Sequence, residues 1–441
     1  MAQENPIVLV HGYSDEGKSF KAWKQALVDR GYDRERIHIC SYRSLTNEVS
    51  IKDIAEAFDR ALRFRAGLRD DQPFDAIVHS TGMLVVRAWH AGYARRSRRL
   101  KRLIGLAPAS FGSPMAHKGR SFLGAVFKGS RNAGPDFLEA GDMILDGLEL
   151  GSRFTWDLAH ADLLGDEATY GPGSDTPYVF TFCGNKGYGG MRKLVSEEGT
   201  DGTVRWAACA LNTRKIKVNL TKHTAEQRIE AARRSSVDIP LVMVKGLNHG
   251  TILESPTKEL VSLVDKALQV GSEAQFAEWK KAAAISSKAA EDTVDQWQQF
   301  VTRLQDERGD PVADYNIELL RKSPKGKWQR LEGFDLDVHA YSGDRSLRCF
   351  HVNLTDLAKR QTGALRMNLT ASSGTEMVGY LGFGSDNASR SAIEVDLPAG
   401  FDDGKMKFFH PYTTTLVEIT INREPLPLDR ESRVLEFITG A

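Results

Sequence analysis

The sequence predicts an α/β fold with a mostly parallel sheet, followed by a helical connector and an antiparallel β-sandwich. Up to about Val270, short apolar runs alternate with amphipathic helical stretches, which is typical of strands buried on both faces of a helix-covered sheet. After Pro311, short alternating segments follow one another without helix signals between them. We therefore expect three regions, 1–270, 271–309 and 310–441.

The elements of the first region are predicted from their apolar patterns. The strands are apolar throughout and bounded by polar residues, glycine or proline, whereas each helix has one apolar face. The expected strands are Ile7–Val10, Ile37–Cys40, Ala76–Val78, Leu103–Leu106, Tyr178–Phe182 and Leu241–Val244. The expected helices are Phe20–Arg30, Ile51–Arg65, Met83–Arg99 and Pro256–Val270, the last with Ser255 as its N-cap.

A long insertion interrupts the alternation between Ser110 and about Thr176. It is rich in glycine and contains helix-like pieces such as Phe137–Leu150. Insertions of this length in a parallel-sheet protein are usually lids. We expect a lid over about 110–176, and its apolar side chains suit a cover over an acyl pocket. They include Phe122, Leu123, Val126, Phe127, Met143, Ile144 and Leu145.

One long helix is expected over Ser272–Glu307. Ser272 and Gln275 form a capping-box pair at its start, and Gly309 with Pro311 would end it. Apolar residues recur at every seventh position, so this helix or the C-terminal region could pair with a second copy of the chain. The repeated residues are Phe276, Ala283, Ala290, Trp297 and Leu304.

The C-terminal region is expected to be a β-sandwich that binds substrate, membrane or a partner. Its aromatic side chains are more typical of a core than of a surface platform. The expected strands are Leu347–Val352, Ala364–Leu369, Met377–Phe383, Ala392–Val395, Lys407–Phe409 and Val417–Ile421.

Composition limits the classes of partner and compartment. Across 441 residues the net charge is only +1, so the overall electrostatic footprint of a nucleic-acid-binding protein is missing. The scattered cysteines Cys40, Cys183, Cys209 and Cys349 indicate buried thiols in a reducing compartment. The sequence shows no signal peptide and no membrane-spanning segment, which favours a cytoplasmic protein, with secretion by an unconventional route left open.

The sharpest local signal is the segment AIVHSTGMLVVR at 76–87. Ser80 follows a strand and precedes a helix, a junction that strains the serine backbone and projects its hydroxyl above the sheet edge. Gly82 is needed because strand and helix approach too closely there for a Cβ atom. The sequence Val-His-Ser-Thr-Gly resembles the nucleophile elbow of the α/β-hydrolases, the esterase and lipase family, with Val78 at the first glycine of the usual G-x-S-x-G.

This resemblance implies an oxyanion hole near Ser80 and the α/β-hydrolase fold. His11-Gly12-Tyr13 closes the first strand, and in similar hydrolases such a segment turns a backbone N–H toward the nucleophile. By this match the N–H groups of Tyr13 and Thr81 would hold the oxyanion, a contribution of about 3–4 kcal/mol. The expected fold is that of an α/β-hydrolase with a helical lid insertion.

The remaining partners of Ser80 are expected at the ends of later strands. Asp201 begins an Asp-Gly-x-Val segment that resembles the one in bacterial lipases whose aspartate orients the histidine, although Asp-Gly is also a common hairpin turn. Asp175 and Asp238 are weaker candidates because they precede strands. His249 follows the last strand of the first region, where this fold keeps its base.

The order Ser80, Asp201, His249 is the one expected for this family. His249 would take the proton of Ser80 as it attacks an acyl carbonyl, and Asp201 would orient the imidazole. No metal or organic cofactor is required. Related bacterial lipases often bind calcium through an aspartate just after the histidine, but Gly250 stands there in this chain.

Two further features have alternative interpretations. His79, beside Ser80, is expected to pack against the elbow or the oxyanion turn. The basic run Arg95–Arg102 favours a solvated face that complements the helix dipole, with contact to anionic lipid head groups as the sharper alternative.

The sequence therefore predicts a serine carboxylic ester hydrolase, a lipase or esterase, that cleaves lipid-like acyl esters. Phospholipase A-type activity, acyl transfer or amide cleavage at the same triad are alternatives, as is a hydrolase-fold protein that binds without catalysis. The expected partners are an acyl ester substrate and, peripherally, a membrane or lipid aggregate.

Overall fold

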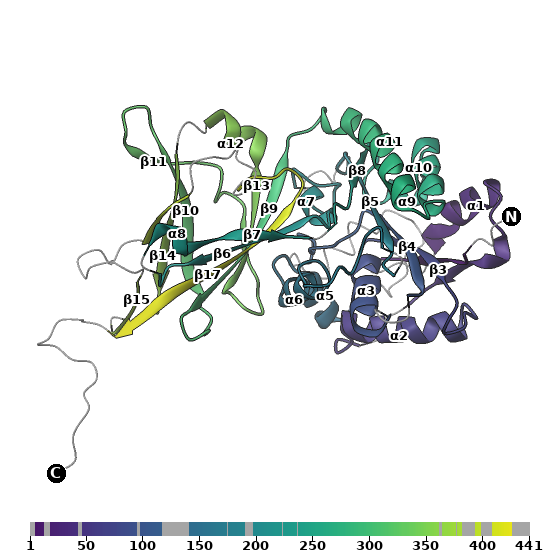
Figure 1. Ribbon diagram of the computed structural model, residues 1–441, viewed down its shortest axis with the longest axis horizontal. Coiled ribbons are helices and arrows are strands. Elements are labelled where there is room, and N and C mark those ends of the chain that lie inside the picture. The colour runs from purple at the N-terminus through teal and green to yellow at the C-terminus, as the bar shows by residue number, and fades with distance from the viewer. Residues whose placement is uncertain are drawn as a thin grey trace, which may run out of the picture. The chain divides into compact units, whose positions relative to one another are not determined.

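The computed structural model divides the chain into two compact units (Figure 1). Unit 1 comprises 1–213, 234–296 and 412–414, and unit 2 comprises 214–233, 297–411 and 415–441. The structure describes residues 5–12, 18–42, 46–94, 98–116, 141–173, 175–189, 197–222, 224–235, 237–360, 364–375, 377–381, 393–397 and 408–425. The predictions for Tyr13, for 95–97, for the apolar residues of 122–127, for 137–140, for Phe383, for Ala392 and for Lys407 lie outside these ranges. The strand expected over Lys407–Phe409 was wrong at its described residues, since Phe408 and Phe409 belong to no strand.

Unit 1 is built around a parallel sheet, which confirms the predicted α/β-hydrolase architecture. In the described part of the chain its strand order is β2-β1-β3-β4-β5-β8, and each pair of neighbours is parallel. Every strand was expected within a few residues of where it lies, because the runs are apolar on both faces. The strands are β1 (Ile7–Val10), β2 (Ile37–Cys40), β3 (Phe74–His79), β4 (Leu100–Leu106), β5 (Tyr178–Gly184) and β8 (Leu241–Val244).

Helices cover both faces of this sheet (Figure 1). α1 (Lys21–Asp29), α10 (Lys258–Leu268) and α11 (Glu273–Glu291) lie on one face, and α2 (Ile51–Phe64) and α3 (Gly82–Trp89) lie on the other. Trp23 of α1 and Phe276 and Trp279 of α11 are buried in one apolar core with the strands. Short helical turns complete the unit: η1 (Lys18–Phe20), η2 (Arg34–Arg36), the π-helical η3 (His90–Ala94), α7 (Trp206–Cys209) and α9 (Thr251–Glu254).

Two predicted helix boundaries in unit 1 were wrong. The helix expected over Met83–Arg99 ends as the π-helical turn η3, and Arg98 has a positive φ of 54° just before β4 begins. The helix expected from Pro256 begins at Lys258, and its N-cap is Thr257, whose hydroxyl accepts the Leu260 N–H at 3.2 Å. Thr257 is the better cap because its extended backbone places the hydroxyl above the first turn.

The predicted helix over Ser272–Glu307 is half right. It begins as expected, with the Ser272 hydroxyl accepting the Gln275 N–H, but α11 ends at Glu291. The segment Trp297–Asp306 is instead the strand β9. The prediction was wrong there because Phe300, Thr302 and Leu304 also alternate at the two-residue period of a strand, and pairing with a neighbouring strand outweighs the heptad pattern.

Part of the predicted lid is anchored rather than separate from the core. It contains α5 (Asp142–Leu148), which lies within the helix-like piece expected over Phe137–Leu150, and α6 (Arg153–Asp162). Asp162 of α6 forms a bidentate ion pair with Arg87 of α3, at 2.8 and 2.9 Å, and both side chains are fully buried. This pair holds α6 against the helix that follows Ser80.

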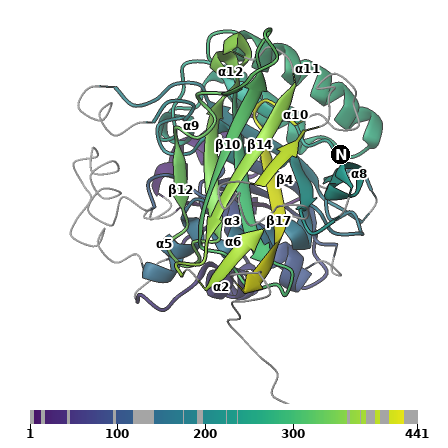
Figure 2. The same ribbon diagram turned by 90° about the vertical axis from the view of Figure 1, so that its left-hand side faces the viewer.

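Unit 2 is a β-rich unit, as predicted, and Figure 2 shows its strands β10, β14 and β17. In the described residues one sheet has the order β12-β13-β9-β17-β6-β7, with β15 on β17, and another has β11-β10-β14-β16. Both sheets contribute to one apolar core, as in a sandwich. The strands and helices are β6 (Thr213–Asn219), α8 (Ala225–Arg228), β7 (Ile229–Arg234), β9 (Trp297–Asp306), β10 (Asp314–Lys322), β11 (Trp328–Arg330), β12 (Val338–Ala340), β13 (Leu347–Asn353), α12 (Leu354–Arg360), β14 (Leu365–Ser372), β15 (Val378–Leu381), β16 (Ile393–Asp396) and β17 (Thr414–Pro425).

The strands β6 and β7 were not expected from the sequence. They come from 214–233, between the strands β5 and β8 of unit 1, yet they complete a sheet of unit 2. Among the described helices, none combines the length and the apolarity needed to cross a bilayer.

Candidate active site

Ser80 lies in the strained turn that joins β3 to α3. Its φ is +53°, a left-handed backbone conformation that is uncommon for residues other than glycine, and the turn is held by hydrogen bonds on both sides. The Ser80 N–H donates to the Leu106 carbonyl at 3.2 Å, and the Ser80 carbonyl accepts the Ala109 N–H at 3.1 Å. The surrounding sheet therefore imposes the backbone conformation that the sequence predicts for a nucleophile elbow.

Gly82 makes the close approach that its position predicts. A Cβ atom at Gly82 would lie 2.6 Å from the carbonyl oxygen of Val10 and 2.9 Å from that of His11. Both atoms belong to backbone at the end of β1 and cannot easily move aside. The start of α3 is thus packed directly against the backbone of Val10 and His11.

His11 and Gly12 form a locked turn beside Ser80. His11 Nδ1–H donates to the Gly12 carbonyl at 2.6 Å, and His11 Nε2 accepts the Tyr42 N–H at 3.0 Å. The His11 ring also stacks on the Tyr42 ring, with centroids 4.6 Å apart. Burial lowers the pKa of His11 to about 4, so the ring is neutral near pH 7 and can keep accepting from Tyr42.

Gly12 adjoins the serine directly. A Cβ atom added there would lie 2.7 Å from Ser80 Cβ, so a larger residue would displace one of the two segments. Tyr42, which holds His11, was not singled out in the sequence. A signal was available, because Tyr42 follows β2 at the same carboxyl edge of the sheet where the other predicted site residues lie.

Asp201 and His249 are brought together although 48 positions separate them. His249 Nδ1–H donates to Asp201 Oδ2 at 3.0 Å, and both side chains are fully buried. The His249 N–H also donates to the Asp201 carbonyl at 2.9 Å. The aspartate that the sequence favoured over Asp175 and Asp238 is thus the one that contacts His249.

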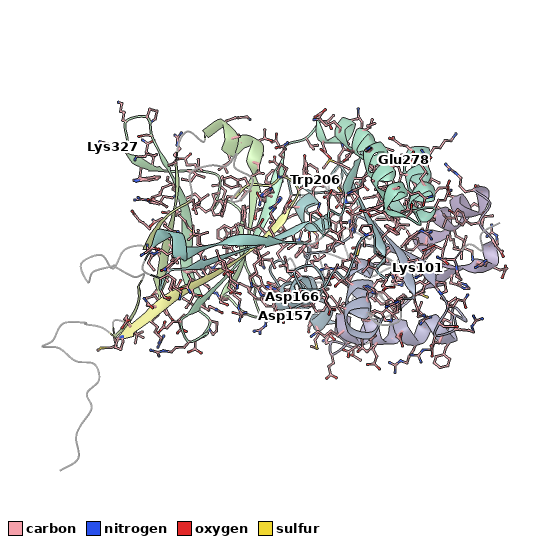
Figure 3. All side chains as sticks on the ribbon, in the orientation of Figure 1. Lys101, Asp157, Asp166, Trp206, Glu278 and Lys327 are labelled. Carbon is pink, nitrogen blue, oxygen red and sulfur yellow. The ribbon has the colours of Figure 1, made fainter. Side chains whose placement is uncertain are left out.

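A tight turn positions the Asp201 carboxylate. Its Oδ1 accepts the N–H groups of Thr203 at 3.0 Å and Val204 at 2.8 Å, which satisfies the buried charge. Trp206 (Figure 3) ties the turn to β5, because its Nε1–H donates to the Gly184 carbonyl at 2.9 Å. Asp201 therefore has one fixed carboxylate oxygen for backbone amides and one for the imidazole.

The two weaker candidates have other partners. Asp175 pairs with Arg98 at 2.8 Å in an exposed position, and Asp238 accepts from the Asn212 side chain at 3.0 Å. Arg98 belongs to the basic run near the end of the elbow helix. Another member of that run, Arg102, is mostly buried and pairs with Asp75 at 2.9 Å, so this cation serves the fold of unit 1.

His79 connects the serine segment with the His249 loop. Its Nε2–H donates to the His249 carbonyl at 3.0 Å, and the two rings lie 4.7 Å apart between centroids. Since His79 directly precedes Ser80, this bond links the end of β3 to the loop after β8, although β4 and β5 lie between these two strands in the sheet. It brings His249, and Asp201 with it, to the same edge of the sheet as Ser80. Within each unit taken by itself, the described residues bring no three metal-ligating side chains close enough to share an ion.

The parallel sheet, the covering helices and the strained serine turn define an α/β-hydrolase fold, and the chain resembles the esterases and lipases that share it. No protein-family model and no curated protein sequence matches the chain. Among solved structures, phospholipase PlaB from Legionella pneumophila in complex with thio-NAD is 25% identical, with a TM-score of 0.79 over 99% of this chain and 97% of that one. A second structure of the same phospholipase gives a TM-score of 0.78 with the same identity and coverage.

Proposed function

We propose that this protein is a serine carboxylic ester hydrolase that acts on lipid esters, with phospholipids as the favoured substrate class. The observation that carries the proposal is the buried Asp201–His249 pair at the same sheet edge as the strained Ser80. A serine, a histidine and an orienting carboxylate in this arrangement are the requirements for an activated nucleophile. The favoured substrate class rests on the similarity to the phospholipase over 99% of the chain.

In the proposed reaction His249 Nε2 takes the proton of the Ser80 hydroxyl as Ser80 Oγ attacks the acyl carbonyl carbon. Asp201 stabilises the imidazolium that forms, and backbone N–H groups, predicted to be those of Thr81 and Tyr13, stabilise the oxyanion. The leaving alcohol takes the proton from His249, which leaves an acyl-enzyme on Ser80. Water activated by His249 then releases the fatty acid and restores the serine.

The alternatives use the same residues and differ in the molecule that meets the acyl-enzyme. Water gives hydrolysis, whereas an alcohol or amine acceptor would give acyl transfer. A binding protein without catalysis would need the fold but not an activated serine. Contact with a lipid aggregate and pairing with a second copy of the chain remain predictions of the same proposal.

The experiment that tests the proposal is labelling with a fluorophosphonate probe, which reacts with activated serines. The wild-type protein should be labelled at Ser80, and the Ser80→Ala variant should not be. The labelled peptide is identified by mass spectrometry, and circular dichroism confirms that both proteins are folded. A folded wild-type protein that stays unlabelled at Ser80 would refute the proposal.

A substrate panel then separates the classes of ester. Phospholipid vesicles, triacylglycerol emulsions and short soluble esters are compared at matched acyl concentration, with release of fatty acid as the readout. We expect the highest rate on phospholipid. A higher rate on triacylglycerol would replace phospholipase activity by lipase activity without changing the roles of Ser80, Asp201 and His249.

A further inference from the structure

A buried histidine that the proposed reaction does not use lies next to Ser80. His79 is the last residue of β3 and is only 4% exposed. Its Nε2 lies 3.0 Å from the His249 carbonyl oxygen, which can only accept, so the proton is on Nε2. Nδ1 is therefore unprotonated, and it has no hydrogen-bond partner among the described residues. Its surroundings are tight, since a Cβ atom at Gly12 would lie 3.2 Å from it.

The backbone of His249 is held on both sides of its Cα atom. On one side, its N–H donates to the Asp201 carbonyl at 2.9 Å. On the other side, its carbonyl accepts from His79 at 3.0 Å. The first bond fixes His249 to the loop that carries Asp201, and the second fixes it to β3, which directly precedes Ser80. The His79 bond thus joins the segment of the base to the segment of the nucleophile.

The loop that carries His249 is attached to β3 by the His79 hydrogen bond. Gly246 in this loop has a positive φ of 80°, and the turn that follows is organised by the Asn248 side chain, which accepts the N–H groups of Gly250 and Thr251. These hydrogen bonds lie within the loop and fix its internal conformation. The hydrogen bond from His79 is different, because it joins the loop to β3.

We propose that His79 is a positioning residue, which holds the His249 main chain, and through it the imidazole, at the distance from Ser80 that proton transfer requires. This inference rests on the proposed function, because it assigns a role to His79 only through His249 and Ser80. Misplacing a catalytic group by about 1 Å can cost about 10²-fold in rate, so a single backbone anchor can have a large effect.

The choice of histidine for this anchor has a chemical reason. Burial, and next the proximity of His249, lower the pKa of His79 well below its ordinary value, so its ring stays neutral. His249 becomes positively charged during the proposed reaction. A lysine or arginine donor at this position would oppose that charge, whereas a neutral imidazole donates the same hydrogen bond without doing so.

Two matched substitutions separate the hydrogen bond from the packing of the ring. His79→Phe keeps a planar ring of similar size but removes the donor. His79→Gln removes the ring but places an amide N–H near the position of Nε2. Activity on a short soluble ester is measured as separate kcat and KM values, together with the rate of fluorophosphonate labelling and the melting temperature.

We expect His79→Phe to lower kcat about 10- to 100-fold and the labelling rate in parallel, with KM within about twofold of the wild-type value. His79→Gln should recover most of the lost kcat. The inference is overturned if a folded His79→Phe variant keeps the wild-type kcat, if the loss falls on KM instead, or if the two variants are equally impaired.

Two further comparisons cover a variant that does not fold and separate failure of this inference from failure of the proposed function. If His79→Phe does not fold, His79→Gln is compared with His79→Asn, whose shorter amide cannot reach the carbonyl; a higher kcat for Gln supports the inference and equal values overturn it. A wild-type protein unlabelled at Ser80 refutes the proposed function, and the inference with it. A labelled wild-type protein beside a fully active His79→Phe variant refutes the inference alone.

Discussion

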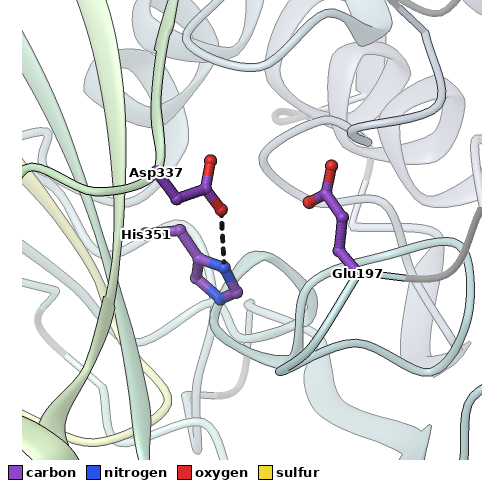
Figure 4. A group of neighbouring side chains, drawn as sticks. All are labelled: Glu197, Asp337 and His351. Carbon is purple, nitrogen blue, oxygen red and sulfur yellow. Dashed lines mark hydrogen bonds and ion pairs between the residues drawn. The ribbon is translucent and has the colours of Figure 1, made fainter. Parts of the chain in front are cut away.

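Each of the two units contains a histidine that is hydrogen-bonded to an aspartate, and the surroundings of the two pairs differ. In unit 1, His249 Nδ1 and Asp201 Oδ2 lie 3.0 Å apart, and both side chains are fully buried. In unit 2, His351 Nδ1 and Asp337 Oδ2 lie 3.3 Å apart (Figure 4), but the Asp337 side chain is 41% exposed. The His351 ring stacks on Trp297, with centroids 4.3 Å apart.

The two pairs have the same residue types but differ in the surroundings of the carboxylate. The Asp201 carboxylate is held in one orientation by two backbone N–H groups and is shielded from water. Its negative charge therefore acts strongly on the His249 imidazole, to which it is hydrogen-bonded. The half-exposed Asp337 carboxylate is screened by solvent. Burial of the carboxylate is therefore what distinguishes the pair proposed for catalysis.

The largest effect is expected from Asp201→Asn. This change keeps the shape of the side chain but removes the charge and favours the wrong imidazole tautomer, which should lower kcat about 10⁴-fold. Asp337→Asn is the matched control and should leave kcat unchanged. Steady-state kinetics on a short soluble ester measure both. Equal losses in the two variants would abolish the distinction between the pairs.

A second pair of variants compares the contribution to stability of a buried ion pair with that of an exposed one. Arg87→Met leaves the Asp162 carboxylate buried without its cation and should lower the free energy of unfolding by about 3–5 kcal/mol. Arg98→Met breaks the exposed pair with Asp175 and should cost less than about 1 kcal/mol. Urea unfolding monitored by tryptophan fluorescence gives both values. A cost below 1 kcal/mol for Arg87→Met would show that burial is not the deciding factor.

Acid should destabilise unit 1 through His11. Because burial lowers the pKa of this side chain to about 4, the unfolded chain binds its proton first as the pH falls. The stability supplied by neutral His11 is complete above about pH 6.5 and declines down to about pH 4, by about 3 kcal/mol in total. The test compares pH profiles of unfolding for the wild-type protein and His11→Gln, so that only the contribution of His11 differs between them. Parallel profiles would contradict the prediction.

The smallest of these effects is expected from Gly82→Ala, at about 1–3 kcal/mol of stability, because the new methyl group meets the backbone carbonyls of Val10 and His11. Gly92→Ala is the control, since nothing lies within 4 Å of the added atom. Its effect should stay within about 1 kcal/mol. Thermal unfolding measures the difference between the two variants, and equal melting temperatures would show that the turn beside Ser80 can relax.

Several features of the fold could be predicted because their cause is local. The strands Ile7–Val10, Ile37–Cys40 and Leu241–Val244 begin and end where the apolar pattern places them. Other features could not be. The segment Trp297–Asp306 is compatible with a helical and a strand period, and only its pairing between β13 and β17 decides for the strand. The strands β6 and β7 were not expected because their sequences are not continuously apolar. They pair in a sheet of unit 2 and not in the parallel sheet of unit 1.

The sequence by itself determined the strand–serine–helix junction at Ser80, because backbone sterics act between near neighbours. It also favoured glycine at position 82, but the carbonyls that exclude a Cβ atom there belong to Val10 and His11, far away along the chain. Only the tertiary structure decided that Asp201 contacts His249, that Tyr42 locks His11, and that His79 holds the His249 carbonyl. These contacts join residues far apart along the chain. A hydrogen bond forms only where two groups come within about 3 Å, and the packing of the whole sheet sets that distance.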